Sequence, residues 1–405
     1  MTPANKAART ERQAGAERLR LFVACAPGLE DLLVEELTEL GVEEAVAVPG
    51  GASCFGDLDT LYRINLGSGL GLRVLVRVAE FFVRDFAKLE RVAADIEWER
   101  YLGIEEGVRV RAHSKRSRLY HTKAIAQRVE RGIVARLGGR GAKVDVHADT
   151  AVGPGGGELG SVERQPTLVQ VRMVRDRCTI SVDTTGTMLH KRGWRAATAK
   201  APLREDIARA LLRLSGWTPG MALFDPATGS GTLVIEAATI AMGRPPGDAR
   251  SFAFVRQPSF DAARFEAQRE GLRGPAHTGR VTLLGCDRNE GAVEAANGNA
   301  GRAGVEGLVE FVQRSVGAAE LPTLEGAGVV LIANPPWGRR TGDRGRLRNL
   351  YASLGNLARR LPRPTRIALV TSDASLAGAT GLGLERRVDT DHGGVKISLW
   401  TGVVE

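Results

Sequence analysis

The stretch VVLIANPPW spans residues 329–337 and joins an apolar run to a proline-containing end. The run over 329–333 predicts a buried strand, and the two prolines that follow stop it, because proline has no N–H for the ladder and fixes φ. Asn334, Pro335, Pro336 and Trp337 are therefore expected on the loop at the C-terminal end of that strand. In an open parallel α/β sheet, this is the edge at which ligands bind.

Asn334 and Pro335 offer two oxygen acceptors beside an aromatic ring. The side-chain carbonyl of Asn334 and the backbone carbonyl of Pro335 can both accept from one exocyclic NH2 group and orient its nitrogen toward an electrophile. Trp337 supplies a face on which a flat base can stack, with a contribution on the order of 1–3 kcal/mol. The tetrapeptide suits an amine on a planar ring, while a rigid Asn-Pro-Pro turn without chemistry is the plainer alternative.

Strands and helices alternate on both sides of this run, apart from a proline-rich, polar insertion at 244–279. The alternation predicts an α/β domain over residues 187–405, with a doubly wound, Rossmann-like sheet and an antiparallel edge hairpin. Its predicted elements are helix 202–216, a strand, glycine turn and helix over 221–243, strand 281–287, helix 289–304, strands 308–313, 329–333 and 366–372, and a closing hairpin over 384–404.

Two further features of this domain favour a ligand site. The turn DPATGSGT (225–232) lets the backbone approach a ligand at a helix N-terminus. It does not fit the dinucleotide GxGxxG fingerprint, because Val234 stands where the third glycine would be, so an NAD site is a poor match. Asp287 ends the next strand and can accept both hydroxyls of a ribose, although an ordinary helix N-cap is the alternative.

Two smaller units are predicted before this domain, behind a flexible arm at 1–20. Residues 21–81 have the rhythm of a ferredoxin-like α+β sandwich, and the pattern restarts over 82–186. The predicted elements are strand 21–25, helix 27–41, a strand pair at 45–57, helix 59–69, strand 73–81, helix 85–98, strand 107–114, helix 121–139 and a hairpin over 167–185 that turns at Arg175-Asp176; the glycine-rich piece 151–160 is predicted to be a surface loop.

The basic charge is concentrated in one segment. The net charge is +9, and residues 109–140 alone hold ten Lys or Arg and one acid, Glu130. A phosphate-rich partner is favoured over a merely solvated face. The residues expected to contact this partner are Arg109, Arg111, Lys115, Arg116, Arg118, Lys123 and Arg128. Arg339 and Arg340 are expected to contact its phosphates close to the base that the Asn334 loop would hold.

The composition excludes several classes of protein. The first twenty residues are polar, and no run approaches the roughly 18 apolar residues of a membrane span. A soluble, cytoplasmic protein and a monomer are expected, without a membrane partner. The four cysteines are scattered without metal-ligand spacing, so we expect buried thiols, no disulfide and no metal.

Several of these stretches resemble a known family. VACAPGLEDLLVEELTELG (23–41) and SKRSRLYHTKAIAQRVERGI (114–133) are similar to the ferredoxin-like unit and the THUMP domain of RNA-modifying enzymes. DPATGSGT, GCD (285–287) and NPPW, in this order, resemble class I S-adenosylmethionine-dependent methyltransferases that act on exocyclic amines. Together they resemble the RNA guanine-N2 methyltransferases of 23S rRNA or tRNA.

The resemblance implies a cofactor, S-adenosylmethionine, and a role for each matched residue. Asp225, Thr228, Gly229 and Gly231 would form the methionine-side pocket, Asp287 would hold the ribose, and Pro202 and Glu205 would close the pocket. Asn334, Pro335 and Trp337 would hold the guanine during direct methyl transfer. Two positions depart from the family pattern: Trp337 replaces a Tyr or Phe, and Ser315 stands near the place of an Asp that contacts the adenine.

The substrate implied is a guanine N2 in structured RNA, with 23S rRNA as the first expectation. The alternatives are a tRNA guanine-N2 methyltransferase, a DNA adenine-N6 methyltransferase, and a glutamine-amide methyltransferase, which is hard to reconcile with the basic segment. The alternative outside the enzymes is a non-catalytic RNA-binding or ribosome-assembly factor, and the missing Asp near Ser315 favours this alternative.

Overall fold

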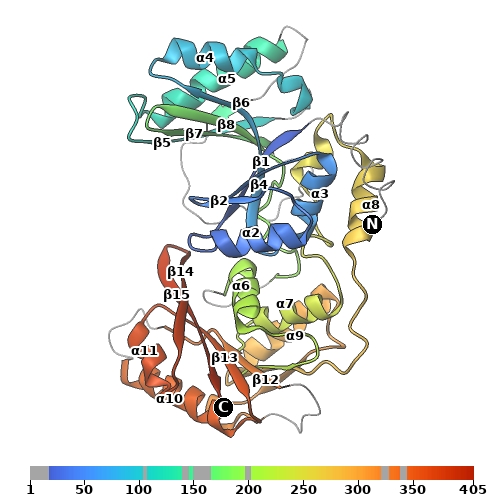
Figure 1. Cartoon of the computed structure of the whole chain (residues 1–405), viewed down its shortest axis with the longest axis vertical. Helices are drawn as coiled ribbons and strands as arrows, with labels where there is room; N and C mark the ends of the chain where they lie inside the picture. Colours follow the sequence, from blue (N-terminus) through green and yellow to red (C-terminus); the bar gives the residue numbers. More distant parts are fainter. Residues whose placement is uncertain are drawn as a thin grey trace.

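The computed structural model describes residues 18–103, 107–138, 146–148, 166–196, 202–320, 328–337 and 344–405. Three units follow one another along the long axis of the molecule in Figure 1. The ferredoxin-like unit, in blue, occupies the middle. The basic unit (residues 82–186) lies above it and the C-terminal domain (residues 187–405) below it.

The first two units share one mixed eight-stranded sheet in the order β2-β3-β1-β4-β8-β7-β5-β6. The long strand β4 joins them, because it pairs with β1 on one side and with β8 on the other. The predicted hairpin turn at Arg175 and Asp176 is confirmed. The strands are β1 (Leu19–Cys25), β2 (Val46–Val48), β3 (Gly51–Gly56), β4 (Gly71–Phe82), β5 (Val108–Lys115), β6 (Val146–Ala148), β7 (Thr167–Val174) and β8 (Arg177–Asp183).

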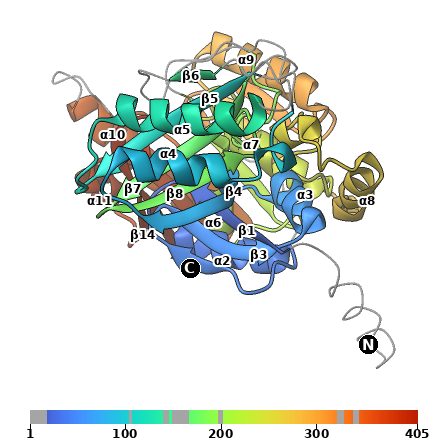
Figure 2. The same cartoon turned by 90° about the horizontal axis from the view of Figure 1, so that it is seen from above.

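Helices cover this sheet. In Figures 1 and 2, α4 and α5 lie side by side over the strands of the basic unit. Helix α4 begins after Asp85, whose side chain accepts the N–H of Lys88 at 2.7 Å. Helix α2 is shorter than predicted, because Gly28 has a φ of +82°, which a right-handed helix cannot include, and its N–H donates to the Glu30 carboxylate. The helices are α2 (Glu30–Glu39), α3 (Leu58–Gly67), α4 (Phe86–Asp95) and α5 (Thr122–Gly138).

The C-terminal domain contains a seven-stranded sheet in the order β11-β10-β9-β12-β13-β15-β14. All its pairs are parallel except those made by β15, which confirms the doubly wound sheet with an antiparallel edge. The chain order reverses between β9 and β12, the place where such sheets bind ligands. The strands are β9 (Ala222–Asp225), β10 (Leu283–Asp287), β11 (Glu310–Gln313), β12 (Val329–Ala333), β13 (Thr365–Thr371), β14 (Glu385–His392) and β15 (Val395–Val404).

Three helices of this domain were not predicted. Helix α8 lies inside the insertion that the sequence analysis treated as polar, and it packs on α3 of the ferredoxin-like unit, where Tyr62 contacts Phe265 with ring centroids 5.6 Å apart. Helices α10 and α11 follow β12 and β13. The helices are α6 (Glu205–Ser215), α7 (Thr232–Ala241), α8 (Ala262–Leu272), α9 (Glu290–Ala303), α10 (Arg344–Arg360) and α11 (Ala374–Ala379).

The ferredoxin-like unit and the C-terminal domain share a hydrophobic core. One cluster of buried side chains contains Leu33 of α2 and Val74 of β4 together with Leu211 of α6 and Ile235 of α7. The basic unit has a separate cluster around α4, α5, β7 and β8. The two lower units are therefore packed as one body, and the continuous sheet carries the basic unit on top of it.

Candidate active site

The glycine-rich turn between β9 and α7 bends the backbone tightly. Gly229 and Gly231 have φ angles of +53° and +83°, a region that glycine adopts without steric cost. A Cβ on Gly231 would lie 2.9 Å from the ring of Phe311 and 3.1 Å from Cβ of Ala296. The turn therefore needs its glycines, and it brings bare backbone to the N-terminus of α7, where N–H groups can face a ligand.

Asp287 fixes this turn from the neighbouring strand. Its Oδ2 accepts the N–H of Gly229 at 3.0 Å, and its Oδ1 accepts the N–H of Asn289 at 2.9 Å. The cap of α9 is Asn289, whose side chain accepts the N–H of Gly291 at 3.0 Å. Asp287 is therefore not the helix N-cap, and its carboxylate stands at the tip of β10.

Asp225 ends β9 and exposes only 1% of its surface. Burial raises the pKa of its carboxyl to about 8, although the N–H donated by Ala227 at 3.1 Å acts in the opposite direction. The neighbouring Asp287 carboxylate raises this pKa further. Asp225 therefore holds a proton at pH 7, and a cation placed beside it would favour release of that proton.

Asn334 follows the last residue of β12, as predicted. Its amide oxygen is buried and has no hydrogen-bond partner among the described residues. Pro335 is buried next to it, and Pro336 is exposed. A buried acceptor without a donor costs about 1–3 kcal/mol. A ligand that brings an N–H to this point would satisfy it.

A cavity of about 690 Å³ lies between the glycine turn and the Asn334 loop. Its size is in the range of sites that hold cofactors and other small molecules. Predicted site residues from four separate segments meet around it. They are Pro202, Asp225, Thr228, Gly229, Asp287, Asn334, Pro335 and Trp337.

Three predicted site residues do not line this cavity. Glu205 is buried in α6, where it accepts from Nε of Arg195 at 3.0 Å. Gly231 forms the N-cap of α7, and Ser315 follows β11. Glu205 acts on the site through Arg195, whose Nη1 also donates to the Ser230 hydroxyl at 3.0 Å and so ties the glycine turn to α6.

His190 and His392 also line the cavity, and neither was among the predicted site residues. His190 has a buried Nδ1 without a partner among the described residues, and burial lowers its pKa to about 3. His392 lies at the end of β14; its Nε2 accepts the N–H of Arg204 at 3.2 Å and lies 3.1 Å from the carbonyl oxygen of Pro202. Both rings are neutral at pH 7, because burial also lowers the pKa of His392.

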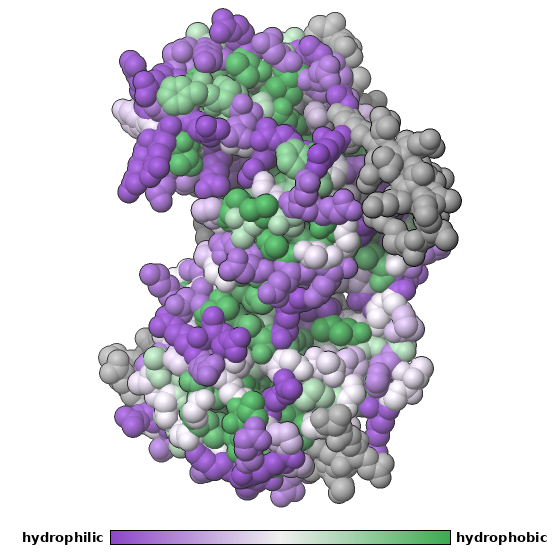
Figure 3. Space-filling model, in the orientation of Figure 1, coloured by the Kyte–Doolittle hydropathy of each residue, from purple (hydrophilic) through white to green (hydrophobic). Residues whose placement is uncertain are grey.

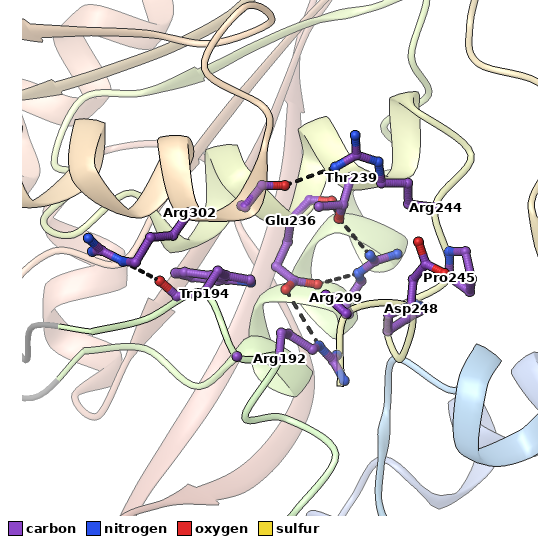
Figure 4. Close-up of a pocket in the computed structure, with 13 residues that line it drawn as sticks. Arg192, Trp194, Arg209, Glu236, Thr239, Arg244, Pro245, Asp248 and Arg302 are labelled. Carbon is purple, nitrogen blue, oxygen red and sulfur yellow. Dashed lines mark hydrogen bonds and ion pairs between the residues drawn. The ribbon is translucent and has the colours of Figure 1, made fainter. Parts of the chain in front are cut away.

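A second cavity, of about 190 Å³, is drawn in Figure 4. Its charged lining is paired, because Glu236 accepts from Arg209 and Nε of Arg192 lies 3.5 Å from Glu236, whereas the indole Nε1 of Trp194 has no hydrogen-bond partner among the described residues. Arg192 also donates to the Gly69 carbonyl at 2.7 Å. These groups join the ferredoxin-like unit to the C-terminal domain, so we assign this cavity a structural role.

The predicted RNA-binding residues of the basic unit fall into two groups. Arg109, Lys115, Arg116, Arg118 and Lys123 are exposed, as is Arg111, which has a partner within the described chain. Arg128 differs, because its Nη1 pairs with Glu90 at 2.8 Å. Figure 3 shows hydrophilic side chains along the left-hand rim of this unit. The predicted contacts of Arg339 and Arg340, and the predicted loop at 151–160, lie outside the described residues.

The remaining expectations concern cysteines, metals and membranes. All four cysteines are buried free thiols. Among the described residues, no group of His, Cys, Asp or Glu side chains is arranged to hold a metal ion. In the same part of the chain, no helix combines the length and apolar character that crossing a membrane requires.

The chain is similar to several known proteins. Residues 192–387 match the RMKL-like methyltransferase domain, and residues 20–75 match the RlmL ferredoxin-like domain. A protein of Synechocystis sp., provisionally named an RNA methyltransferase, is 31% identical over 380 residues, which cover 93% of this chain and 95% of that protein. The ribosomal RNA large subunit methyltransferase K/L of Syntrophotalea carbinolica is 34% identical over 373 residues, which cover 90% of this chain and 50% of that protein.

The chain thus spans about half the length of the K/L enzyme that it matches. Among solved structures, SMU.472, described as a methyltransferase complexed with S-adenosylhomocysteine, has a TM-score of 0.82 at 27% identity, with 96% of this chain and 99% of that chain covered. The matches extend over the ferredoxin-like unit, the glycine turn and the Asn334 loop alike. The chain therefore belongs to the family of RMKL-like methyltransferases.

Proposed function

We propose that this protein transfers a methyl group from S-adenosylmethionine to the exocyclic N2 amine of a guanine in structured RNA, with 23S rRNA as the first candidate. The observation that carries the proposal is the buried amide oxygen of Asn334 at the cavity, which has no hydrogen-bond partner in the described part of the chain. It needs an N–H donor there, and an exocyclic amine supplies one. The Pro335 carbonyl and the Trp337 ring beside it complete a holder for an amine on a planar base.

The other side of the cavity fits the cofactor. The Thr228 hydroxyl is buried beside the Asp225 carboxyl, whose pKa it lowers through a side-chain hydrogen bond, and both groups line the cavity. Asp225, whose burial keeps it protonated, would become a carboxylate beside the α-ammonium group of a bound amino acid. Asp287 presents acceptors for a ribose at the tip of β10. When bound, S-adenosylmethionine supplies a methyl group that is already activated for attack.

The protein residues then position the amine and stabilise the transition state. Asn334 and Pro335 hold the two hydrogens of the amine, which orients the nitrogen lone pair toward the methyl group. The nitrogen becomes positively charged as the bond forms, so carbonyl dipoles aimed at it stabilise the transition state more than the ground state. No covalent nucleophile is required. The target base must leave its stack or come from a single-stranded loop to reach the cavity.

The RNA would be bound by the upper rim of the molecule. Exposed cations of β5 and the following loop lie in the basic unit, whereas the cavity lies in the C-terminal domain (Figure 1). A substrate that touches both must span two domains, as a folded RNA can. The names of the relatives support rRNA, and tRNA stays the second candidate.

The test is transfer of a labelled methyl group to total RNA from a strain that lacks the protein, followed by nucleoside analysis of separated rRNA and tRNA. Label in N2-methylguanosine would support the proposal and identify the RNA. Asn334→Ala should abolish turnover while RNA binding persists, and Asn356→Ala, an exposed Asn on α10, serves as the matched control. Label in DNA adenine, or in neither nucleic acid, would contradict the proposal.

A further inference from the structure

An exposed aromatic pair stands directly before helix α5. Tyr120 exposes 66% of its surface. Its ring centroid lies 4.1 Å from that of His121, with an angle of 39° between the rings. A single exposed aromatic side chain is ordinary on a protein surface. The loop that holds this one, however, is built to keep it in place.

Hydrogen bonds fix the loop between β5 and α5 from several sides. The hydroxyl of Ser114 donates to the carbonyl of Leu119 at 2.6 Å, and Leu119 is buried in the core of the basic unit. The N–H of Arg118 donates to Oδ1 of Asp176 at 2.6 Å, and the hydroxyl of Ser117 accepts the N–H of Asp176 at 3.0 Å. After Tyr120, the carbonyl of His121 accepts the N–H of Ile125 at 3.0 Å, so the backbone is held on both sides of Tyr120 while its ring is exposed.

Asp176 is itself held by a second partner. Its Oδ2 accepts from Nε of Arg84 at 2.8 Å. The N–H of Arg118 and then the Arg84 guanidinium lower the pKa of this carboxyl, so the anchor stays charged at neutral pH. A ring that is held before binding loses little conformational entropy when a ligand stacks on it.

The charges around the ring fit a polyanion. Lys115, Arg116 and Lys123 are exposed, and none of them forms an ion pair with another residue in the described ranges. Farther along α5, by contrast, Arg128 and Arg136 pair with Glu90 and Glu99. Three exposed cations without an ion pair in the described chain therefore lie at the end of the helix that carries the aromatic pair. The first N–H groups of α5 open toward the same loop.

We propose that Tyr120 and His121 form a stacking platform for one unpaired base of the RNA, with the flanking phosphates on Lys115, Arg116 and Lys123. This rests on the proposed function, because it takes RNA as the substrate. A paired base hides both faces inside the helix, whereas an unpaired base offers one to an aromatic ring. The platform lies in the basic unit and the cavity in the C-terminal domain (Figure 1), so the stacked nucleotide is not the methylated one.

The experiment compares two RNAs on the full chain. One is a hairpin with 2-aminopurine in its loop, and the other is a blunt duplex of the same length. Tyr120→Ala should weaken hairpin binding by about 5- to 150-fold and abolish the quenching of 2-aminopurine fluorescence, with duplex binding unchanged. Tyr120→Phe should restore both signals. Phe55→Ala is the matched control, because Phe55 is a 43% exposed aromatic residue on β3.

Equal weakening for hairpin and duplex would overturn the platform, and so would unchanged binding of both. Turnover separates this inference from the proposed function. With saturating RNA, Tyr120→Ala should keep the wild-type kcat while its KM for RNA rises. If the wild type methylates no RNA, the proposed function fails, yet the comparison of hairpin and duplex binding still decides the platform.

Discussion

Trp337 meets His392 edge to face, with ring centroids 5.8 Å apart and ring planes at 89°. The same imidazole accepts the N–H of Arg204 at 3.2 Å. His392 therefore connects the loop that would hold the base with the segment that would close the cofactor pocket. It reaches this place because β15 runs antiparallel to β13, which returns the β14–β15 turn to the edge where β13 ends.

His392→Ala should therefore impair both halves of the site. Loss of the hydrogen bond and of the aromatic contact, each worth about 0.5–1.5 kcal/mol, should weaken S-adenosylmethionine binding about tenfold and also lower kcat. His392→Gln places an amide oxygen near the position of Nε2, so it should recover cofactor affinity but not kcat. His277→Ala, an exposed histidine, is the control. Calorimetry and turnover measure the two effects, and wild-type values for His392→Ala would exclude the connection.

Asp225 should make cofactor binding release a proton. Its pKa is raised from 3.8 to about 8 by burial, so the folded apoprotein holds a proton that the unfolded chain loses above pH 3.8. This contribution to stability is present at low pH and is lost as the pH rises through about 8. A bound ammonium group reverses the preference and expels the proton, so affinity should increase from pH 6 to 8.

The proton can be counted by titration calorimetry at pH 7 in phosphate and in Tris, which have different ionisation enthalpies. The wild type should release close to one proton per cofactor. Asp225→Asn should release none and bind more weakly, and Asp31→Asn, on an exposed position of α2, should behave as the wild type. A wild-type enthalpy that is independent of the buffer would place the ammonium group elsewhere.

Gly231 offers a test of the turn itself. An added methyl group would meet Phe311 at 2.9 Å while the backbone stays at a φ of +83°. Gly231→Ala should therefore cost about 1–3 kcal/mol of stability, measured by urea unfolding, together with cofactor affinity. Gly301→Ala is the matched control: Gly301 lies in α9 with no atom close to its missing Cβ, so it should gain up to about 1 kcal/mol. Equal stabilities for the two variants would show that the turn tolerates a side chain.

The sequence was sufficient to predict the sheet and the loop at its edge. An apolar run that ends in two prolines is best explained as a buried strand followed by a loop, and the glycines of the turn 225–232 indicate that the backbone comes close to a ligand. The histidines were missed because a lone His has no spacing pattern, and their partners come from distant segments. The position of His392 could have been predicted, since an antiparallel last strand must place the turn before it at the ligand-binding edge of the sheet.

Two other misses have different causes. Helix α10 carries Leu350, Leu354 and Leu357 at helical spacing, a signal that was present but was passed over beside the arginines. The pairing of Arg128 with Glu90 could not be predicted, because it depends on how α4 lies along α5. Charge counted along the sequence therefore overstates the charge that the basic unit presents to a partner.

That pairing gives the last prediction, which concerns salt dependence. Each cation that neutralises a phosphate steepens the fall of log Kobs with log[salt] by about 0.7–0.9. Arg109→Gln and Lys123→Gln should each flatten this slope by about that amount, because both side chains are exposed. Arg128→Gln, a matched change in the same basic segment, should leave the slope almost unchanged, since its Nη1 lies 2.8 Å from the Glu90 carboxylate. Filter binding between 50 and 200 mM salt measures the slopes. Equal slopes for all three variants would contradict this prediction. The double variant Arg109→Gln/Lys123→Gln then decides where the RNA binds, because an unchanged slope would exclude this face of the basic unit.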